Sequence, residues 1–213
     1  MKKSFLIFAG LSLFLAATSE AQVARVFVAT NGNDLNDCLT PSSACRTLNG
    51  GIGKVDAQGE VIVTESGSYA GATITKGVKI NVPSGIVAFS GLLIASNPGP
   101  TGVVVVRGVT LKSATPGSGI GLQVQTGHLF LENSVIDGWA TGLQVDPSGA
   151  KIFVKNSTLR NNATGLSVSA SATLSQVVVE GSQFENNGTG LSALAGKVAA
   201  ERVNTGETPR VGV

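Results

Sequence analysis

The side chains that could carry out acid–base chemistry are few in this sequence, and they do not cluster. His128 is the only histidine, and a histidine that acts as a catalytic base needs a carboxylate to orient it. When the repeats of the chain are aligned, its neighbour is instead Lys151, which disfavours a charged imidazole. Asp146 stands alone before Pro147 and is typical of a turn. We therefore predict no catalytic residues.

His128 is more typical of a turn residue before the strand over residues 129–131. The alternative is that His128, Lys151 and Trp139 form a candidate ligand surface. The two basic residues would supply a faintly basic strip for acidic sugars, and an indole ring can serve as a platform on which a sugar stacks. Trp139 occupies the repeat position that Asn162 and Asn187 hold in later repeats. We therefore expect Trp139 to lie on or near the protein surface, either as such a platform or as a residue that packs over a turn.

The loop from Asn31 to Asp37 is rich in the oxygen ligands that calcium prefers. Its spacing does not match an EF-hand loop, so we expect a turn-rich loop, with calcium binding as the lesser alternative. We predict no metal site and no cofactor. Glycoside hydrolysis needs two carboxylates across the scissile bond, and the acidic residues of this chain alternate with basic ones instead of pairing.

Composition excludes several classes of protein. The chain has 213 residues, of which 42% are hydrophobic and 13% are charged, so it does not resemble a disordered protein. Its formal net charge is only +2, which gives no long-range attraction to nucleic acid, and we predict no nucleic-acid partner. The length suits one domain with a substantial core.

The first residues are typical of an export signal. Lys2 and Lys3 precede an apolar run over residues 4–17, and Ser19 and Ala21 fit the small-residue rule for cleavage. We therefore predict a signal peptide over residues 1–21, a mature chain from Gln22, no membrane span after cleavage, and a secreted or periplasmic protein. Nothing downstream is long and apolar enough to cross a bilayer.

Cys38 and Cys45 are the only cysteines. An oxidising compartment permits a disulfide between them, and we predict this local bridge. A metal site would need more ligands than the region offers. The loop that the bridge closes is short, so we expect a modest gain in stability.

A Gly-apolar-x-apolar unit recurs along the mature chain and organises it. Its copies are separated by 21, 23 and 25 residues and hold short β-branched strands without helical periodicity. Several short strands in each repeat of this length predict a parallel β-helix of about six or seven coils. The clearest copies begin at Gly121, Gly142, Gly165 and Gly190.

Turn positions of the repeat carry glycine or asparagine. One position holds Gly108, Asn133, Asn156 and Gly181, and these residue types accept the left-handed backbone that a sharp bend requires. Asn162 and Asn187 recur one coil apart, after Asn161 and Asn186, and could stack as a ladder of amides.

Two positions of the repeat carry charges whose sign alternates from coil to coil. Stacked side chains of opposite sign attract across neighbouring strands, and like signs repel. We therefore predict two charge ladders that set the register, because a slip by one coil would bring like charges together. The first ladder is Arg107, Glu132, Lys155 and Glu180, and the second is Lys112, Asp137, Arg160 and Glu185.

The stretch from Arg25 to Val63 carries a family resemblance. It holds a strand, a Gly-x-Asp loop, a Cys…Cys-Arg-Thr segment and a second strand, followed by Gly67-Ser68-Tyr69. This pattern resembles the start of secreted bacterial proteins of the pectate-lyase-like superfamily. The resemblance implies an all-β fold, a right-handed parallel β-helix (solenoid) with a short N-terminal capping helix. The helix would bury Leu48, Ile52 and Val55 in spite of its glycines.

The resulting domain organisation has four parts. The signal peptide covers residues 1–21, and the N-terminal strand, disulfide loop and capping helix cover residues 22–58. The coils of the β-helix cover residues 59–204, although we expect the repeat pattern to fade from Glu201. A C-terminal tail covers residues 205–213. The last coil would leave strand edges open, which suggests self-association there.

Three functions compete. The first is a non-catalytic secreted β-helix protein that binds or displays something at the cell surface, with a polysaccharide or another surface component as its partner. The second is a divergent lyase or hydrolase acting on acidic polysaccharide. The family's lyases bind calcium through clustered carboxylates, which this sequence lacks. The third is a fragment of an adhesin or passenger. We favour the first, because the charged residues form no catalytic set.

Overall fold

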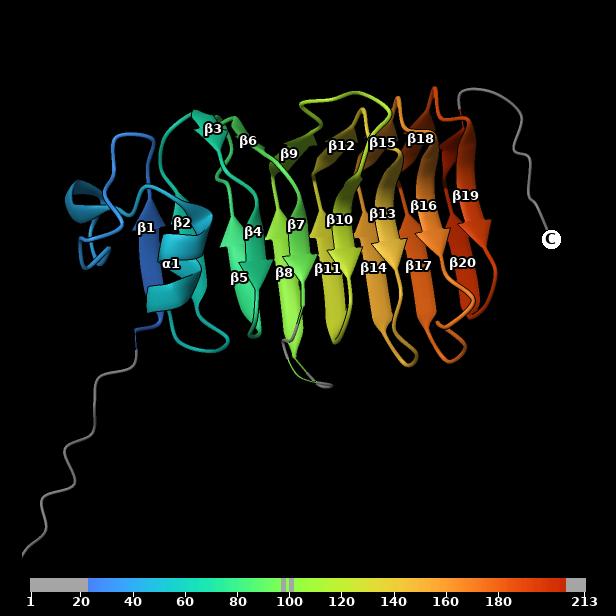
Figure 1. The fold of residues 1–213 in the computed structure, drawn as a ribbon, viewed down its shortest axis with the longest axis horizontal. Helices are drawn as coiled ribbons and strands as arrows, with labels where there is room; N and C mark the ends of the chain where they lie inside the picture. Colours follow the sequence, from blue (N-terminus) through green and yellow to red (C-terminus); the bar gives the residue numbers. More distant parts are fainter. Residues whose placement is uncertain (1–22, 97–98, 100–101, 206–213) are drawn as a thin grey trace, which may run out of the picture.

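The computed structural model describes residues 23–96, 99 and 102–205. The predicted signal peptide and residues 206–213 of the predicted tail lie outside the described residues. The described chain winds through three parallel sheets that stack coil upon coil (Figure 1). It contains one α-helix, α1 (Leu48–Lys54), and one short 3-10 helix, η1 (Pro41–Ser43), among its described residues. The predicted all-β solenoid is confirmed.

Among the described residues, sheet A has eight strands, sheet B has seven and sheet C has six. Sheet A consists of β1 (Arg25–Val28), β2 (Glu60–Val63), β5 (Val78–Asn81), β8 (Val103–Arg107), β11 (His128–Glu132), β14 (Lys151–Lys155), β17 (Gln176–Glu180) and β20 (Lys197–Glu201). Sheet B consists of β3 (Gly67–Tyr69), β6 (Ala88–Ser90), β9 (Val109–Lys112), β12 (Val135–Asp137), β15 (Thr158–Arg160), β18 (Gln183–Glu185) and β21 (Asn204–Thr205). Sheet C consists of β4 (Ala72–Ile74), β7 (Leu93–Ala95), β10 (Ile120–Val124), β13 (Thr141–Val145), β16 (Thr164–Val168) and β19 (Thr189–Ala193).

The core is a continuous apolar column inside the three sheets. Strand side chains alternate between inside and outside, so each coil sends β-branched and leucine residues inward at the same positions. Leu131, Val154 and Val179 stack in this way on sheet A and are essentially inaccessible to solvent. Burial of such columns is the main stabilising contribution to a solenoid.

The bend between sheets A and B is built on a left-handed residue in every coil from β8 onward. Gly108, Asn133, Asn156 and Gly181 have φ of 75°, 48°, 47° and 58°, as predicted. Arg202 takes the same conformation, with φ of 50°, and leads into β21. Although the sequence pattern fades from Glu201, the coil geometry continues through the described residues, with arginine in the glycine or asparagine position.

Two ladders of polar side chains line the bends from inside: serines at the bend between sheets A and B, and asparagines at the bend between sheets B and C. Ser134, Ser157 and Ser182 are buried, and each hydroxyl accepts a hydrogen bond from a backbone N–H of the preceding coil. The predicted amide ladder is also present, because Asn162 Nδ2 donates to Asn187 Oδ1 over 3.0 Å. These ladders satisfy backbone groups that the bends remove from the sheets.

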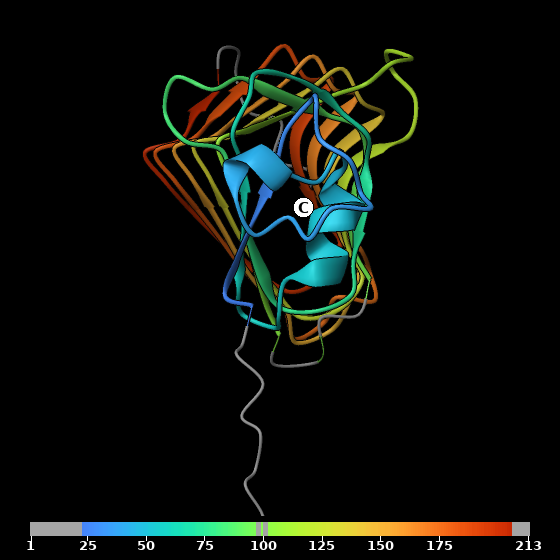
Figure 2. The ribbon, with the colours of Figure 1, turned by 90° about the vertical axis from the view of Figure 1, so that its left-hand side faces the viewer.

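The N-terminal end of the solenoid is covered. Cys38 and Cys45 form the predicted disulfide, and their loop pairs with the outer edge of β1: Phe27 N donates to Cys38 O, and Cys45 N donates to Phe27 O. Helix α1 lies over the open end beside β4 (Figure 2). Its apolar residues Leu48 and Ile52 are buried, as the sequence predicted.

The three glycines of α1 differ in how much space their surroundings leave for a side chain. A Cβ on Gly51 would approach Val28 Cγ2 to 2.8 Å, and one on Gly50 would collide with the Asp34 side chain. A Cβ on Gly53 would meet nothing within 4 Å. Two of the three glycines therefore permit close packing, and the third has no steric role.

We predict opposite effects for two substitutions in α1. Gly53→Ala should raise the free energy of unfolding by about 0.5–1 kcal/mol, because alanine loses less backbone entropy in a helix. Gly51→Ala should lower it by about 1–3 kcal/mol through overpacking against Val28. Urea denaturation of both variants measures this, and equal effects of the two would contradict the packing described here.

Candidate functional site

Trp139 is not the surface platform that its repeat position suggested. Its side chain is 7% exposed, and its indole Nε1 donates to Leu111 O over 3.1 Å. In the next coils Asn162 Nδ2 and Asn187 Nδ2 donate to Ile136 O and Leu159 O, which stack on Leu111 O. The indole N–H therefore replaces an asparagine amide at the head of the ladder. Trp139 is therefore not part of the candidate ligand surface.

His128 and Lys151 lie one coil apart at the start of β11 and β14. His128 Nδ1 accepts a hydrogen bond from the backbone N–H of Lys151 over 3.1 Å. The contact places the ring over the start of the next coil, as a stacked turn residue. Val103 and Gln176 continue the same outward row. Among the described residues, the hydrogen bonds of His128 include none to a carboxylate.

The first charge ladder lies on the outer face of sheet A. Glu132 is in register with Arg107 on one side and Lys155 on the other. Arg107 donates through Nε and Nη2 to Glu132 Oε2 at 2.9 and 2.6 Å, and Lys155 Nζ lies 3.7 Å from Glu180 Oε2. Glu180 is also held by Arg202.

The second charge ladder lies on the outer face of sheet B. Asp137 is in register with Lys112 and Arg160, and Arg160 with Glu185. Within the described chain, only Arg160 and Asp137 of this row approach within ion-pair distance, at 3.2 Å. Asn161 adds a hydrogen bond to Asp137 Oδ1. The charges of this row therefore alternate in sign from coil to coil, but among the described residues only Arg160 and Asp137 form an ion pair.

The sequence analysis missed an apolar strip on the outer face of sheet A. It runs between the first charge ladder and the row of His128 and Lys151, through the stacked residues Val105, Phe130, Phe153 and Val178. The rings of Phe130 and Phe153 are parallel to within 11°, with centroids 4.7 Å apart. Both side chains are half-buried. The signal in the sequence was the outward position of an aromatic residue in two successive repeats.

A groove of about 350 Å³ lies at the end of this strip nearest the N-terminus, where Val105 and Phe130 contribute to its lining. The small side chains of Val103 and Val105 form the floor of the groove. Phe130 lies at one end of the groove, and Lys79 and Glu60 lie at the other end. Asn81, Arg107 and Glu132 form its side. The volume is at the lower end of the range for small-molecule sites.

The aromatic wall of the groove is a ring face. Phe153 covers one face of the Phe130 ring, and Phe153 does not line the groove. The opposite face of Phe130 looks along the strip toward Val105, its neighbour in the preceding strand. A flat apolar ligand surface in the groove would therefore lie against this free face.

The groove is lined by two cations, Lys79 and Arg107, and two anions, Glu60 and Glu132, so its charges balance. Arg107 is neutralised by Glu132, and Glu60 is paired with Arg25 and accepts a hydrogen bond from Asn81 Nδ2. Lys79 belongs to none of the ion pairs among the described residues. A ligand in the groove could therefore bind the Lys79 ammonium group without breaking an existing ion pair of the described residues.

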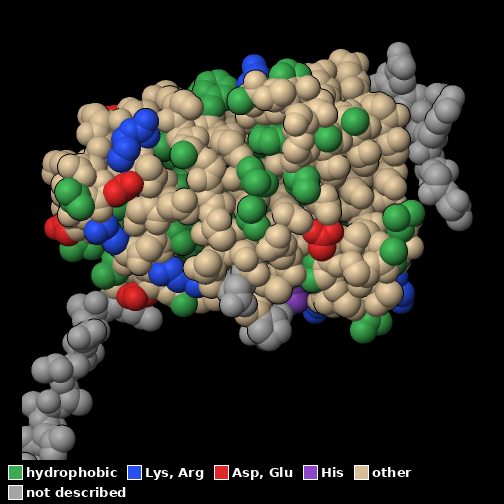
Figure 3. Space-filling model, in the orientation of Figure 1, with side chains coloured by type: hydrophobic (Ala, Val, Ile, Leu, Met, Phe, Trp, Pro, Cys, Tyr) green, Lys and Arg blue, Asp and Glu red, His purple; other side chains and the backbone are tan. Residues whose placement is uncertain are grey.

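The face of sheet C offers a contrast. Figure 3 shows this side of the molecule, where charged side chains gather mainly toward the N-terminal end. The outward row of sheet C is uncharged from β4 to β19, and consists of Thr73, Ile94, Gln123, Gln144, Ser167 and Ser192. Sheet A is therefore the face that combines an aromatic surface, charges and a groove.

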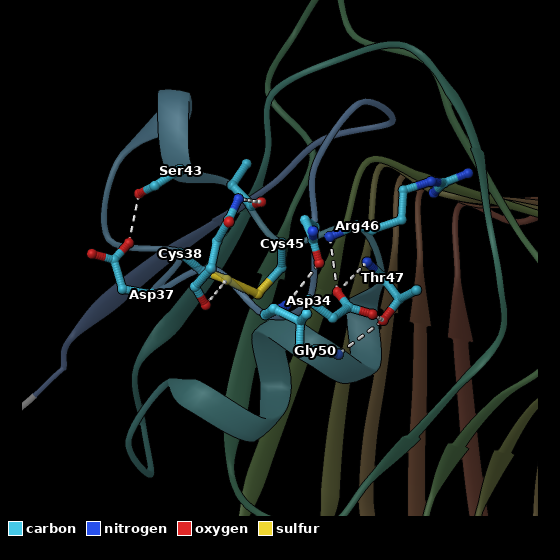
Figure 4. The surroundings of a disulfide bond; sticks show 12 residues. Asp34, Asp37, Cys38, Ser43, Cys45, Arg46, Thr47 and Gly50 are labelled. Atoms are coloured by element: carbon cyan, nitrogen blue, oxygen red, sulfur yellow. Dashed lines mark hydrogen bonds between the residues drawn. A yellow bond between two sulfur atoms is a disulfide. The ribbon is translucent and has the colours of Figure 1, made fainter.

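The acidic loop near the N-terminus uses its oxygens for the fold. Asp34 Oδ1 accepts from the amides of Arg46 and Thr47, and Asp34 Oδ2 accepts from Thr47 Oγ1 (Figure 4). Thr47 in turn caps α1 through Gly50 N. No group of three or more potential metal ligands occurs in the described ranges. The carboxylates here organise the end of the solenoid.

These hydrogen bonds change the acidity of Asp34. Burial of its carboxyl favours the neutral form, but the bonds from Thr47 and Arg46 outweigh it and hold the pKa of Asp34 below its ordinary value of 3.8. Hydrogen bonds from Ser43 and Leu39 likewise lower the pKa of Asp37, and bonds from Thr30 and Asn31 lower that of Glu65.

Comparison with known proteins agrees with this geometry. The family model described as the right-handed β-helix region matches residues 49–204. The chain belongs to this family. Searches of curated proteins and of solved structures found no match. The right-handed β-helix family defines the fold and leaves the function to be argued from the site. No helix among the described residues could cross a membrane.

We predict that reversing Glu132 weakens the fold. Glu132→Lys should lower the free energy of unfolding by about 1 kcal/mol, because it places a cation between Arg107 and Lys155. Adding Arg107→Glu should recover part of the loss, and Glu132→Gln should cost less than the reversal. Denaturation at low and high salt measures these effects. A reversal that is no worse than Glu132→Gln would mean that the ladder does not act electrostatically.

The acidity of Asp34 predicts how stability depends on pH. A lowered folded-state pKa means that the charged carboxylate stabilises the fold above pH 3.8, and that this contribution is lost as the pH falls through the folded-state value. Asp34→Asn should therefore be less stable than the parent at about pH 7, with a difference that shrinks toward about pH 2.5. A difference that is the same at both pH values would refute this account.

Proposed function

We propose that this right-handed β-helix protein is a non-catalytic carbohydrate-binding protein that is secreted or periplasmic and acts at the cell surface. Its ligand is an acidic polysaccharide, bound along the outer face of sheet A. The observation that carries the proposal is the groove, in which the free face of the Phe130 ring and the ammonium group of Lys79 lie at opposite ends of an apolar floor.

The chemistry of the groove suits a sugar acid. The C–H groups on one face of a pyranose ring pack against an aromatic ring, while its hydroxyls need polar partners. Phe130 offers the first, and Asn81 and Arg107 on the side of the groove offer the second. Lys79 supplies a cation for the carboxylate of a uronic acid. His128 and Lys151 extend the basic character along the neighbouring row.

The spacing of the acidic groups favours binding over hydrolysis. Glu60 and Glu132 are the carboxylates of the groove, and they stand on β2 and β11, with β5 and β8 between them. Three strand spacings amount to about 14 Å, whereas glycoside hydrolysis uses carboxyl groups about 5–9.5 Å apart. Asp146 lies elsewhere and accepts from Gln123 and Gln144. A divergent lyase or hydrolase is therefore the weaker alternative.

The location outside the cytoplasm rests on two features. The sequence begins with the pattern of an export signal, and the Cys38–Cys45 disulfide joins the loop that covers β1. Such a bond persists in oxidising compartments and is rare in the cytosol. A binding face on a secreted solenoid can meet polymer chains of a cell wall or surface coat.

Calorimetry with defined oligosaccharides tests the proposal. The probes are hexamers of galacturonate and of mannuronate, with cellohexaose as the neutral comparison. We expect an acidic hexamer to bind, and Phe130→Ala and Lys79→Gln each to weaken that binding by about tenfold. The Lys79 contribution should fall as salt is added.

Phe153→Ala is the matched control. It removes the same ring stack as Phe130→Ala but takes nothing from the lining of the groove, so it should leave the affinity nearly unchanged. Binding of neither acidic hexamer, or binding that Phe130→Ala leaves intact, would refute the site. Release of shortened or unsaturated products would instead support the enzymatic alternative.

A further inference from the structure

The two ends of the solenoid differ in how their strand edges are covered. At the N-terminal end, the disulfide loop pairs with β1, and α1 lies beside β4. At the other end, the inward residues of β20 are open to solvent in the described part of the chain. Val177 and Val179 on β17 are 1% and 0% exposed, whereas their register partners Val198 and Ala200 are half-buried and exposed.

The backbone of β20 has an open side. Lys197 N donates to Ser175 O at 2.9 Å, and Glu201 O accepts from Gly181 N at 3.1 Å. Since N–H and C=O groups alternate in direction along a strand, Lys197, Ala199 and Glu201 bond toward β17. Val198 and Ala200 therefore direct their N–H and C=O groups away from β17. Such an edge is a template for another strand.

The sequence of β20 is complementary to itself. It reads Lys-Val-Ala-Ala-Glu, with a cation at one end and an anion at the other. If two copies run antiparallel with Ala199 opposite Ala199, each Lys197 faces Glu201 of the other copy. Val198 then faces Ala200, and these are the residues whose backbone groups are directed to the open side. Charge, side-chain direction and hydrogen-bonding pattern agree in this single register.

We infer that the exposed edge of β20 binds the same edge of a second copy of this chain, antiparallel about a two-fold axis at Ala199. This pairing adds about four backbone hydrogen bonds and two ion pairs. It also joins the apolar columns of the two solenoids end to end, since Val198 and Ala200 keep their inward direction. The partly buried Leu191 and Val203 border the same opening.

The neighbours of these charges within one chain leave them available. Lys197 is in register with the neutral Gln176, and Glu201 with Glu180. Glu180 is itself held by Arg202 at 2.6 Å and by Lys155 at 3.7 Å. A lysine from a second copy beside Glu201 would thus add an attraction that the single chain lacks at this position.

Cysteine cross-linking tests the register. Residues opposite one another in a non-hydrogen-bonded antiparallel pair have Cα atoms about 4.5 Å apart, which suits a disulfide. Ala199→Cys should therefore give a covalent dimer on oxidation. Val178→Cys is the matched control, because it faces outward on the adjacent covered strand, and it should stay monomeric. Equal cross-linking of both variants, or cross-linking only of Val178→Cys, would overturn the register.

Charge reversal tests the complementarity. Sedimentation equilibrium of the purified chain should show a dimer, and Lys197→Glu or Glu201→Lys should each raise the dissociation constant by about tenfold or more. The double variant should return it to about the parent value, because the attraction is restored with its signs exchanged. Both positions have neighbours that tolerate the change, so each variant should fold.

Three results would overturn the inference. The first is a chain that stays monomeric at every concentration tested. The second is a monomer that dimerises only after deletion of residues 206–213, which would mean that the chain's own tail covers the edge. A dimer whose dissociation constant is unaffected by the single reversals would likewise place the contact elsewhere.

Discussion

The structure depends on one constraint, which is that equivalent residues of successive coils lie directly over one another at the spacing of parallel strands. Each side chain then has its counterparts in the coils before and after as its nearest neighbours. A position must suit a whole column. Leucine and valine columns fill the core, serines and asparagines line the bends, and charges of alternating sign occupy the outer rows, as Arg107, Glu132 and Lys155 do.

Much of the fold could be predicted because the constraint leaves a direct record in the sequence. The turn glycines and asparagines, the alternating charges and the cysteine pair are each recognisable from residue type and spacing. Trp139 was misplaced for a physical reason: its column requires a buried N–H donor, and an indole provides one as well as an amide does. The position of Trp139 in the repeat correctly predicted its place in the coil. The asparagines at the same position in later coils did not predict that its side chain would be buried.

The groove was harder to predict, because it is formed where the columns change. Lys79, Val105 and Phe130 follow one another in a single outward row, yet the early coils repeat only weakly and their alignment is not evident from sequence. A hollow also depends on the difference in size between neighbours, which no single residue reveals. In a regular solenoid, a break in a column is therefore a better indicator of a binding site than the repeated residues are.

The covered N-terminal end has a consequence for the order of folding. Each coil of a solenoid is stabilised mainly by its neighbours, so the first coil has the least support while the chain is incomplete. Here the loop joined by Cys38 and Cys45 pairs with β1, and α1 follows immediately in the chain. The segments that cover the end of the solenoid thus precede the repeats in the chain. A chain that emerges from its N-terminus during synthesis can add each coil to this covered end in turn, with the register set by the coil before.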